Sequence, residues 1–324
     1  MQHRHISRFL VRRIAFLLFG NLLLLLVISM LIRDGGSFGD VILHTAPNIA
    51  PTVLAGLALT GIICAGAIDL SIASVIAVSG VIFGVLVYRQ VEPLFCYAAC
   101  FGTAFCLSML NGYLVRGLRI PAIIVTLAGL AFYRGLALII ADSAISGFSG
   151  NISVQDDAYH APGKEHASAL LGLAIIAGIF WESFAKTPSR WLALGNSEEA
   201  CSLSGLSVGR ILQSAYCVGG IFLGLAALIF VTRVQAIEPA RMALGFELQV
   251  IGAVILGGTN IFGGEGNYAG TVLGALFLYF LSESLVYAGV SPYFQEVVSG
   301  AIIITVIGLD CGMNRRRKML EEVS

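Results

Sequence analysis

Long apolar runs separated by short polar segments are the main pattern along this chain. The hydrocarbon core of a bilayer is about 30 Å thick, so a helix needs about 20 mostly apolar residues to cross it. Runs of this length predict an all-α integral membrane protein with about ten transmembrane helices. The expected spans cover residues 14–32, 46–65, 70–87, 93–115, 122–141, 167–184, 211–231, 248–261, 268–288 and 294–309.

Two features of this pattern indicate short or broken helices. The run at residues 248–261 is short for a full crossing, and only a few Gly, Ala and Asp residues separate 46–65 from 70–87. Lipid tolerates such breaks only where protein or a cavity covers the backbone. No linker or change in composition divides the chain, so we expect a single transmembrane domain over residues 1–324.

The composition supports a membrane location. Charged residues are 12% of the 324, the hydrophobic set is 57%, and the mean hydropathy is +0.90. A soluble domain carries about 25% charged residues. These values exclude a soluble enzyme, a nucleic-acid binder and a disordered chain, and they make the lipid bilayer the expected surroundings. The basic N-terminus leads into a run that is longer than a signal-peptide core and lacks an A-x-A-like cleavage site, so we expect a retained span.

The distribution of charge predicts the orientation. If both termini are cytoplasmic, the inner segments hold 13 Lys and Arg residues, the outer segments hold 5, and the outer segments are rich in Asp and Glu. This asymmetry follows the positive-inside rule. We therefore expect cytoplasmic termini, an outer loop at residues 143–166, and an inner loop at 186–210 with one or two short helices along the membrane surface.

Motifs for cofactor chemistry are missing from the sequence. It contains no phosphate-binding G-x-x-x-x-G-K-[ST], no G-x-S-x-G and no H-E-x-x-H. The seven cysteines form no C-x-x-C pair, and the five histidines lie in terminal or loop segments. We expect no cofactor, metal or catalytic residue in this chain, and therefore no enzymatic activity of its own.

Polar residues interrupt the apolar pattern in the segment GAIDLSIAS, Gly66–Ser74. Asp69 lies between two spans, and Ser71 and Ser74 follow at a spacing typical of helix N-caps. One interpretation is a capped helix start at an inner turn. The other is a gate element of a transport pathway, because acids inside membranes are costly and usually functional.

A second polar set lies in the segment Ile120–Gly135. Pro121 opens a helix there, and Thr126 and Tyr133 are seven residues apart, so they share a helix face. Thr126 is a candidate pathway residue, and a structural role is the alternative. Arg134 lies late in the span, and we expect its side chain to extend outward.

The third segment, Ile255–Leu276, is rich in glycine. Gly266, Gly270 and Gly274 are spaced by four, which predicts one smooth helix face for close packing. Thr259 and Asn260 precede them and are further pathway candidates. The G-G-E-G sequence between these sets predicts an inner turn.

Four segments in this order resemble one known family. They are GAIDLSIAS, NGYLVRGLRIPAIIVTLAGLAFYRGLAL, ALGNSEEACSLSGLSVGRI and IGAVILGGTNIFGGEGNYAGTVLGAL. They are similar to motifs of the permease subunit of bacterial ABC importers for monosaccharides of the ribose/xylose/galactose type, over about residues 46–309. Ala67 and Ala73 replace glycines of the family pattern, and Asn196–Ser197 replaces its usual Gly-Asn.

The resemblance implies a permease in the bacterial inner membrane that moves a monosaccharide or related carbohydrate. It implies a second permease copy or a homologous permease, cytoplasmic ATPase subunits that bind ATP-Mg, and a periplasmic sugar-binding protein. The ATPase-coupling loop is then expected in the inner loop, at Gly195, Glu198, Glu199, Leu203 and Gly205. The alternative is a solvated surface helix whose acids balance Arg190 and Arg210.

Two other functions are open at this point. An ion-coupled secondary transporter of a small polar solute would need titratable residues deep in the bundle, and most acids here lie near span ends. A membrane enzyme would need a cluster of acid, base or metal ligands at one interface.

Overall fold

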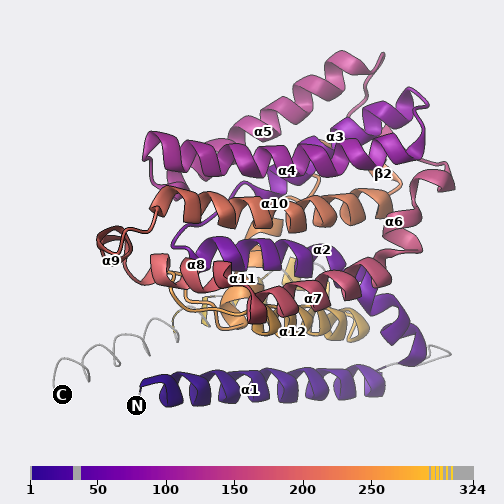
Figure 1. Ribbon diagram of the computed structural model, residues 1–324. Coiled ribbons are helices and arrows are strands. Elements are labelled where there is room, and N and C mark those ends of the chain that lie inside the picture. The colour runs from indigo at the N-terminus through magenta and orange to yellow at the C-terminus, as the bar shows by residue number, and fades with distance from the viewer. Residues whose placement is uncertain are drawn as a thin grey trace.

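The protein is described here by a computed structural model (Figure 1). The structure describes residues 2–31, 38–291, 293–295, 297–298, 300–301, 304–305 and 308, without the side chains of 2–12, 38, 40 and 42–43. The span expected at residues 294–309 lies in part outside this range.

Helices form almost all of the regular structure in these residues, in agreement with the predicted all-α class. The strands are two residues long each. The elements are α1 Gln2–Leu31, α2 Phe38–Cys64, α3 Ile72–Tyr88, α4 Pro93–Leu118, α5 Ala122–Ala144, β1 Ile152–Ser153, the 3-10 helix η1 Asp157–Tyr159, α6 Ala161–Lys164, α7 Ala167–Phe184, α8 Lys186–Asn196, α9 Glu198–Leu203, α10 Val208–Arg233, β2 Ala236–Ile237, α11 Phe246–Leu256 and α12 Tyr268–Tyr287.

Seven of the described helices are long and apolar enough to cross a membrane: α1, α2, α4, α5, α7, α10 and α12. Two apolar helices are shorter, α3 with 17 residues and α11 with 11. The predicted break after the second span and the predicted short eighth span are both confirmed. Helix α11, which corresponds to the eighth expected span, ends at Leu256, five residues before the expected 261. It ends there because Gly258 adopts a φ of +105°, which does not fit an α-helix.

The centre of the bundle is formed by α2, α3 and α10. Of the most apolar stretch of α2, 89% is buried inside the protein, compared with 17% for α1 and 22% for α4 and α7. In Figure 1, α2 and α10 lie between α4 on one side and α12 and α1 on the other. Large apolar side chains such as Phe16, Phe19 and Phe180 remain exposed on the peripheral helices. These faces fit contact with lipid, because a helix that is apolar all round belongs in a core or a bilayer.

The two ends of the bundle differ in structure. The beginning of α1 lies at the same end as α9, whereas α6 and β2 lie at the opposite end (Figure 1). The loop at 143–166, for which the sequence showed no strong pattern, contains β1, η1 and α6. Its strand β1 pairs antiparallel with β2, with Ile152 opposite Ile237. The loop is therefore an ordered cap on this end.

Side chains fasten the cap to the helices. Tyr97 of α4 donates a hydrogen bond to the Ala158 carbonyl oxygen at 2.7 Å, and Tyr159 donates to the Val91 carbonyl oxygen at 2.9 Å. On the surface of the cap, the Lys164 ammonium is 2.9 Å from the Asp157 carboxylate. The hydrogen bond that Lys164 donates, and its positive charge, lower the pKa of the Asp157 carboxyl.

The Arg134 side chain, which was expected to extend outward, reaches the segment that follows β2 at the cap end. Its guanidinium donates hydrogen bonds to the carbonyl oxygens of Pro239 and Met242, at 3.0 and 2.7 Å. Arg134 therefore holds the segment between β2 and α11 against α5. A buried carbonyl needs a donor, and a guanidinium has five N–H groups to offer.

Candidate functional site

The break between α2 and α3 is organised by Asp69. One carboxylate oxygen of Asp69 accepts hydrogen bonds from the Ser71 backbone N–H at 2.8 Å and from the Ser71 hydroxyl at 2.6 Å. Ser71 occupies the N-cap position of α3, but its side chain does not cap the helix. The predicted N-cap role of Ser71 and Ser74 is therefore wrong, because the Ser71 hydroxyl bonds to Asp69 and the Ser74 hydroxyl bonds to Leu130 of α5.

A buried polar network joins this break to two neighbouring helices. Asn111 of α4 donates to the Ser71 hydroxyl at 2.8 Å and to the second oxygen of Asp69 at 3.3 Å, and Tyr133 of α5 donates to Asn111 at 2.7 Å. We call Asp69, Ser71, Asn111 and Tyr133 the Asp69 network. Each member is at most 3% exposed. Asn111 was missed at the sequence level because its spacing from Asp69 carries no signal of contact.

No Lys or Arg side chain pairs with Asp69 among the residues that the structure describes. A buried carboxylate without a cation depends on hydrogen-bond donors to offset its desolvation. The three donors from Ser71 and Asn111 have this role. The Asp69 carboxylate is therefore stable in this buried site only while these hydrogen bonds are made.

Two more predicted residues lie beside the network. Thr126 of α5 donates to the carbonyl oxygens of Ile68 and Ala122, at 3.1 and 2.9 Å, and Ser74 donates to the Leu130 carbonyl oxygen at 2.7 Å. Both are fully buried. The structure therefore brings Asp69, Ser71, Ser74 and Thr126 together into one joint between the break and α5.

Thr259 and Asn260 belong to a different feature, the turn between α11 and α12. The Asn260 side chain accepts from the Phe262 backbone N–H at 3.0 Å, and its backbone N–H donates to the Glu265 carbonyl oxygen at 2.9 Å. Thr259 is buried, and its hydroxyl has no hydrogen-bond partner among the described residues. Asn260 thus shapes the predicted G-G-E-G turn.

This turn meets the α2–α3 break at three glycines. The Gly264 backbone N–H donates to the Cys64 carbonyl oxygen at 3.1 Å. A Cβ atom on Gly263 would lie 2.9 Å from the Gly66 Cα atom, and a Cβ on Gly195 of α8 would overlap the Cys64 carbonyl oxygen. Gly66, Gly195 and Gly263 form what we call the glycine junction. Gly195 is therefore a packing contact between α8 and the two breaks, not an exposed part of the coupling loop.

The other expected coupling residues lie on or beside the short helix α9, which projects at one end of the bundle (Figure 1). Glu198 and Glu199 begin this helix and are exposed, and Leu203 at its end is 83% exposed. Gly205 follows with a φ of +73°. Within the described residues, neither acid forms an ion pair with Arg190 or Arg210. The alternative that these charges balance one another therefore has no support.

The packing glycines divide into two groups. Gly270 and Gly274 lie in α12 against α11, where added Cβ atoms would overlap the carbonyl oxygens of Gly257 and Ala253. Gly266 precedes α12, which begins after its N-cap Asn267, so the expectation of one helix face for all three is wrong. Gly266 packs closely elsewhere, against Cys64 and Thr259. The helix starts late because the Asn267 side chain accepts from the Gly270 backbone N–H at 2.6 Å.

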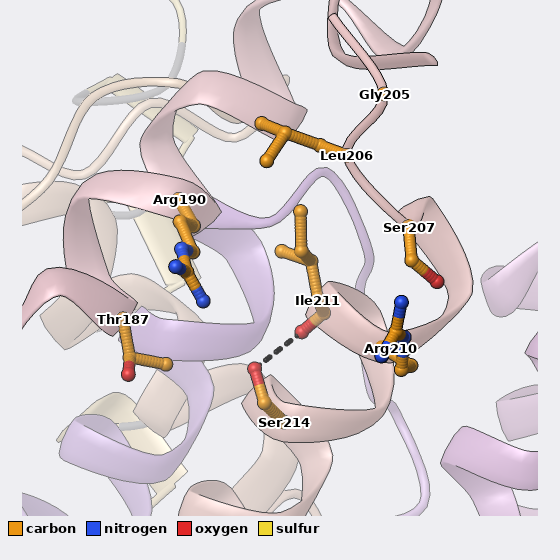
Figure 2. Close-up of a pocket in the computed structure, with 8 residues that line it drawn as sticks. All are labelled: Thr187, Arg190, Gly205, Leu206, Ser207, Arg210, Ile211 and Ser214. Carbon is orange, nitrogen blue, oxygen red and sulfur yellow. Dashed lines mark hydrogen bonds between the residues drawn. The ribbon is translucent and has the colours of Figure 1, made fainter.

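A pocket of about 340 Å³ lies between α8 and the beginning of α10 (Figure 2). Ser214 at its base accepts a hydrogen bond from the buried Trp191 at 2.8 Å and donates to the Ile211 carbonyl oxygen at 2.6 Å. This pocket was missed at the sequence level, because the spacing of Arg190 and Arg210 does not show that α8 and α10 bring them to one site. Its lining residues are Thr187, Arg190, Gly205, Leu206, Ser207, Arg210, Ile211 and Ser214.

Comparison with known families identifies the kind of protein. A family model described as "branched-chain amino acid transport system / permease component" matches residues 41–307. The chain belongs to this permease family. It is accordingly a multi-pass membrane permease component and not an enzyme. Together with the relatives below, this confirms the resemblance of the four sequence segments to sugar importer permeases.

Individual relatives resemble this permease over most of their length. The ribose import permease protein RbsC of Bacillus subtilis is 31% identical, over 83% of this chain and 84% of its own. The D-allose transport system permease protein AlsC of Escherichia coli is 29% identical, over 88% and 89%. The L-arabinose transport system permease protein AraH of Escherichia coli is 30% identical, over 76% and 75%.

Proposed function

We propose that this chain is the permease subunit of an ATP-driven importer that carries a monosaccharide or related carbohydrate across the bacterial inner membrane. The observation that carries the proposal is the similarity to three permeases named for ribose, allose and arabinose, at about 30% identity along most of each chain. All three names refer to monosaccharides, so the shared substrate class is a small polyhydroxylated sugar.

We propose further that the chain has about ten spans with both termini in the cytoplasm. The positive-inside distribution of Lys and Arg supports this orientation. The arrangement of the ends agrees with it, because the beginning of α1 and the inner-loop helix α9 share one end while the β1–β2 cap lies at the other (Figure 1).

In this proposal, ATP-Mg is bound by separate ATPase subunits that contact α9. A short helix with exposed Glu198, Glu199 and Leu203 offers both charge and an apolar side chain to a partner. Its neighbour α8 packs through Gly195 against Cys64 and Gly264. A displacement of α9 would therefore be transmitted by α8 to the α2–α3 break and the α11–α12 turn, because their backbones are in direct contact at Gly195. A second permease copy or a homologous permease and a periplasmic sugar-binding protein complete the assembly.

We propose the joint around Asp69 as the gate element of the pathway. Asp69, Ser71, Ser74 and Thr126 connect the non-helical break to α4 and α5 by hydrogen bonds. In this proposal the joint changes between two arrangements as these hydrogen bonds are broken and remade. Alternating access requires such a two-state element.

The test is uptake of labelled ribose, allose and arabinose into proteoliposomes that contain the permease, its ATPase and its binding protein. We expect uptake of at least one sugar that depends on ATP and on the binding protein. Uptake by the permease alone, driven by an ion gradient, would contradict the proposal and favour a secondary transporter. If none of the three sugars is taken up although the ATPase binds, the proposed substrate class is contradicted.

A further inference from the structure

The pocket between α8 and α10 contains positive charge and hydroxyl groups. Arg190 and Thr187 come from α8. Arg210 comes from the first turn of α10, and Ser207 occupies the N-cap position of that helix. Figure 2 shows the two arginine side chains on opposite sides of Ile211, which stands between them. None of the lining residues is acidic. The pocket is therefore a concave site with two cations and no internal counter-charge.

Neither guanidinium has a partner in the part of the chain that the structure describes. The side chains of Arg190 and Arg210 make no hydrogen bond and no ion pair there, and neither Glu198 nor Glu199 pairs with them. A guanidinium carries five N–H donors in a planar fork, which matches the paired oxygens of a phosphate group. Two unpaired forks at one pocket are typical of a site for an external anion.

We propose that this pocket binds a phosphate-bearing anion, supplied by a lipid headgroup or by a free phosphate. Arg190 and Arg210 bind the phosphate oxygens, and the hydroxyls of Thr187 and Ser207 add further donors. This site goes beyond the transport function proposed above, since no step of sugar movement requires it.

The size and the walls of the pocket fit such a ligand. About 340 Å³ lies at the lower end of the range of about 300–1,000 Å³ that is usual for small-molecule sites. Leu206 and Ile211 form an apolar part of the wall beside the charged part. A glycerophosphate group has the same two-sided character, with a charged end and a carbon backbone.

The position of the pocket allows lipid access. Helix α8 begins two residues after the apolar helix α7 ends at Phe184, so the pocket lies where a span ends. Basic pockets at the cytoplasmic ends of membrane helices attract anionic headgroups. The placement of this end in the cytoplasm depends on the proposed topology, whereas the chemistry of the pocket does not.

The test measures binding to the purified permease in detergent, without ATPase or sugar. The probes are a fluorescent short-chain phosphatidylglycerol, a phosphatidylcholine of the same chain length, and inorganic phosphate as competitor and as direct ligand. We expect phosphatidylglycerol or phosphate to bind the parent at least about tenfold more tightly than the Arg190→Gln/Arg210→Gln variant, because two charge-assisted hydrogen-bonding groups are lost. The Arg190→Lys/Arg210→Lys variant should fall between them, since lysine keeps the charge and loses the fork.

A matched control is Arg241→Gln, an exposed arginine in the segment between β2 and α11. It should bind like the parent. Both pocket arginines are exposed and their side chains are unpaired, so we expect their substitution to leave thermal stability unchanged. Equal melting temperatures of parent and variants will show that the fold is intact.

The outcomes separate the two sources. Binding of phosphatidylglycerol that resists phosphate assigns the site to a lipid headgroup. Direct binding of inorganic phosphate, with displacement of the lipid probe, assigns it to a free phosphate. Equal binding by parent and Arg190→Gln/Arg210→Gln, or an equal loss in Arg241→Gln, would overturn the proposal. Because the assay uses the permease alone, a negative result leaves the sugar-import test unaffected, and failure of sugar import leaves this test unaffected.

Discussion

At the scale of residues, the central feature is a carboxylate buried without a cation. Asp69 is 1% exposed and relies on Ser71 and Asn111 for hydrogen bonds. Such a group is stable only as part of a complete set of partners, since each lost donor exposes the full cost of desolvation. In the proposed gate, opening and closing would break and remake these hydrogen bonds.

We predict that Asn111→Leu destabilises the permease by about 2 kcal/mol or more, because the Asp69 carboxylate loses a donor in a buried site. Thermal unfolding in detergent measures the effect. Asn151→Leu, at an exposed position in the cap, is the control and should change stability little.

A second substitution tests the assignment to Asp69. In the Asn111→Leu background, Asp69→Asn should recover part of the lost stability, because it removes the charge that needs the donor. If Asn111→Leu unfolds at the parental temperature, the network does not stabilise the joint. If the two substitutions are simply additive, the effect of Asn111 does not act through Asp69.

At the scale of elements, helix α12 and helix α11 pack through glycine. Gly270 lies so close to the Gly257 carbonyl oxygen that an added Cβ would overlap it. Small residues at such contacts allow backbones to approach, which is the main source of helix association in lipid. The spacing of Gly270 and Gly274 predicted this contact, while Gly266 fell outside the helix because the chain is still turning at Asn267.

We predict that Gly270→Leu prevents assembly of the permease instead of only slowing transport. The leucine side chain would force α12 away from α11, and no rotamer removes an overlap that involves the Cβ atom. Membrane accumulation and size-exclusion profiles measure the effect. Gly172→Leu is the matched control, because a Cβ at Gly172 in α7 meets no atom within 4 Å. Normal accumulation and parental transport by Gly270→Leu would contradict the packing argument.

The short helix α9 carries the proposed contact with the ATPase. We predict that Glu198→Arg/Glu199→Arg weakens ATPase binding by about 2 kcal/mol or more, as expected for charges at a docked interface. Co-purification of the ATPase and substrate-stimulated ATP hydrolysis in proteoliposomes measure the loss. On a solvated face the same change would cost little.

The control for this prediction reverses two adjacent acids at the other end of the molecule, Asp156→Arg/Asp157→Arg. Both are exposed in the cap. This variant should retain the ATPase. If Glu198→Arg/Glu199→Arg retains full ATPase binding and stimulated hydrolysis, the proposed contact is wrong and the two acids are solvated surface charges.

At the scale of the whole molecule, the two ends of the bundle have different chemistry. One end has the projecting helix α9 and the arginine-lined pocket, and the other has the β1–β2 cap (Figure 1). In the proposed importer, these two ends would meet different partners, the ATPase at α9 and the sugar-binding protein at the cap.

We predict that a membrane-impermeant thiol reagent labels a cysteine placed at Gly150 in intact spheroplasts and does not label one placed at Ser197. Gly150 is exposed in the cap, and Ser197 precedes α9 at the opposite end. Labelling of both after membrane permeabilisation is the control. The reverse pattern in intact spheroplasts would overturn the proposed orientation.

Local sequence determined the positions of the spans, the break near Asp69, the turn after α11 and the membership in a permease family. These features follow from run length, glycine conformation and ordered motifs, which are properties of neighbouring residues. Packing of helices decided the rest. Asn111 meets Asp69 from 42 positions away, Gly195 meets Cys64, and Arg190 and Arg210 come to one pocket. The sequence spacing of such residues carries no signal of contact, because the crossing of rigid helices sets which side chains meet.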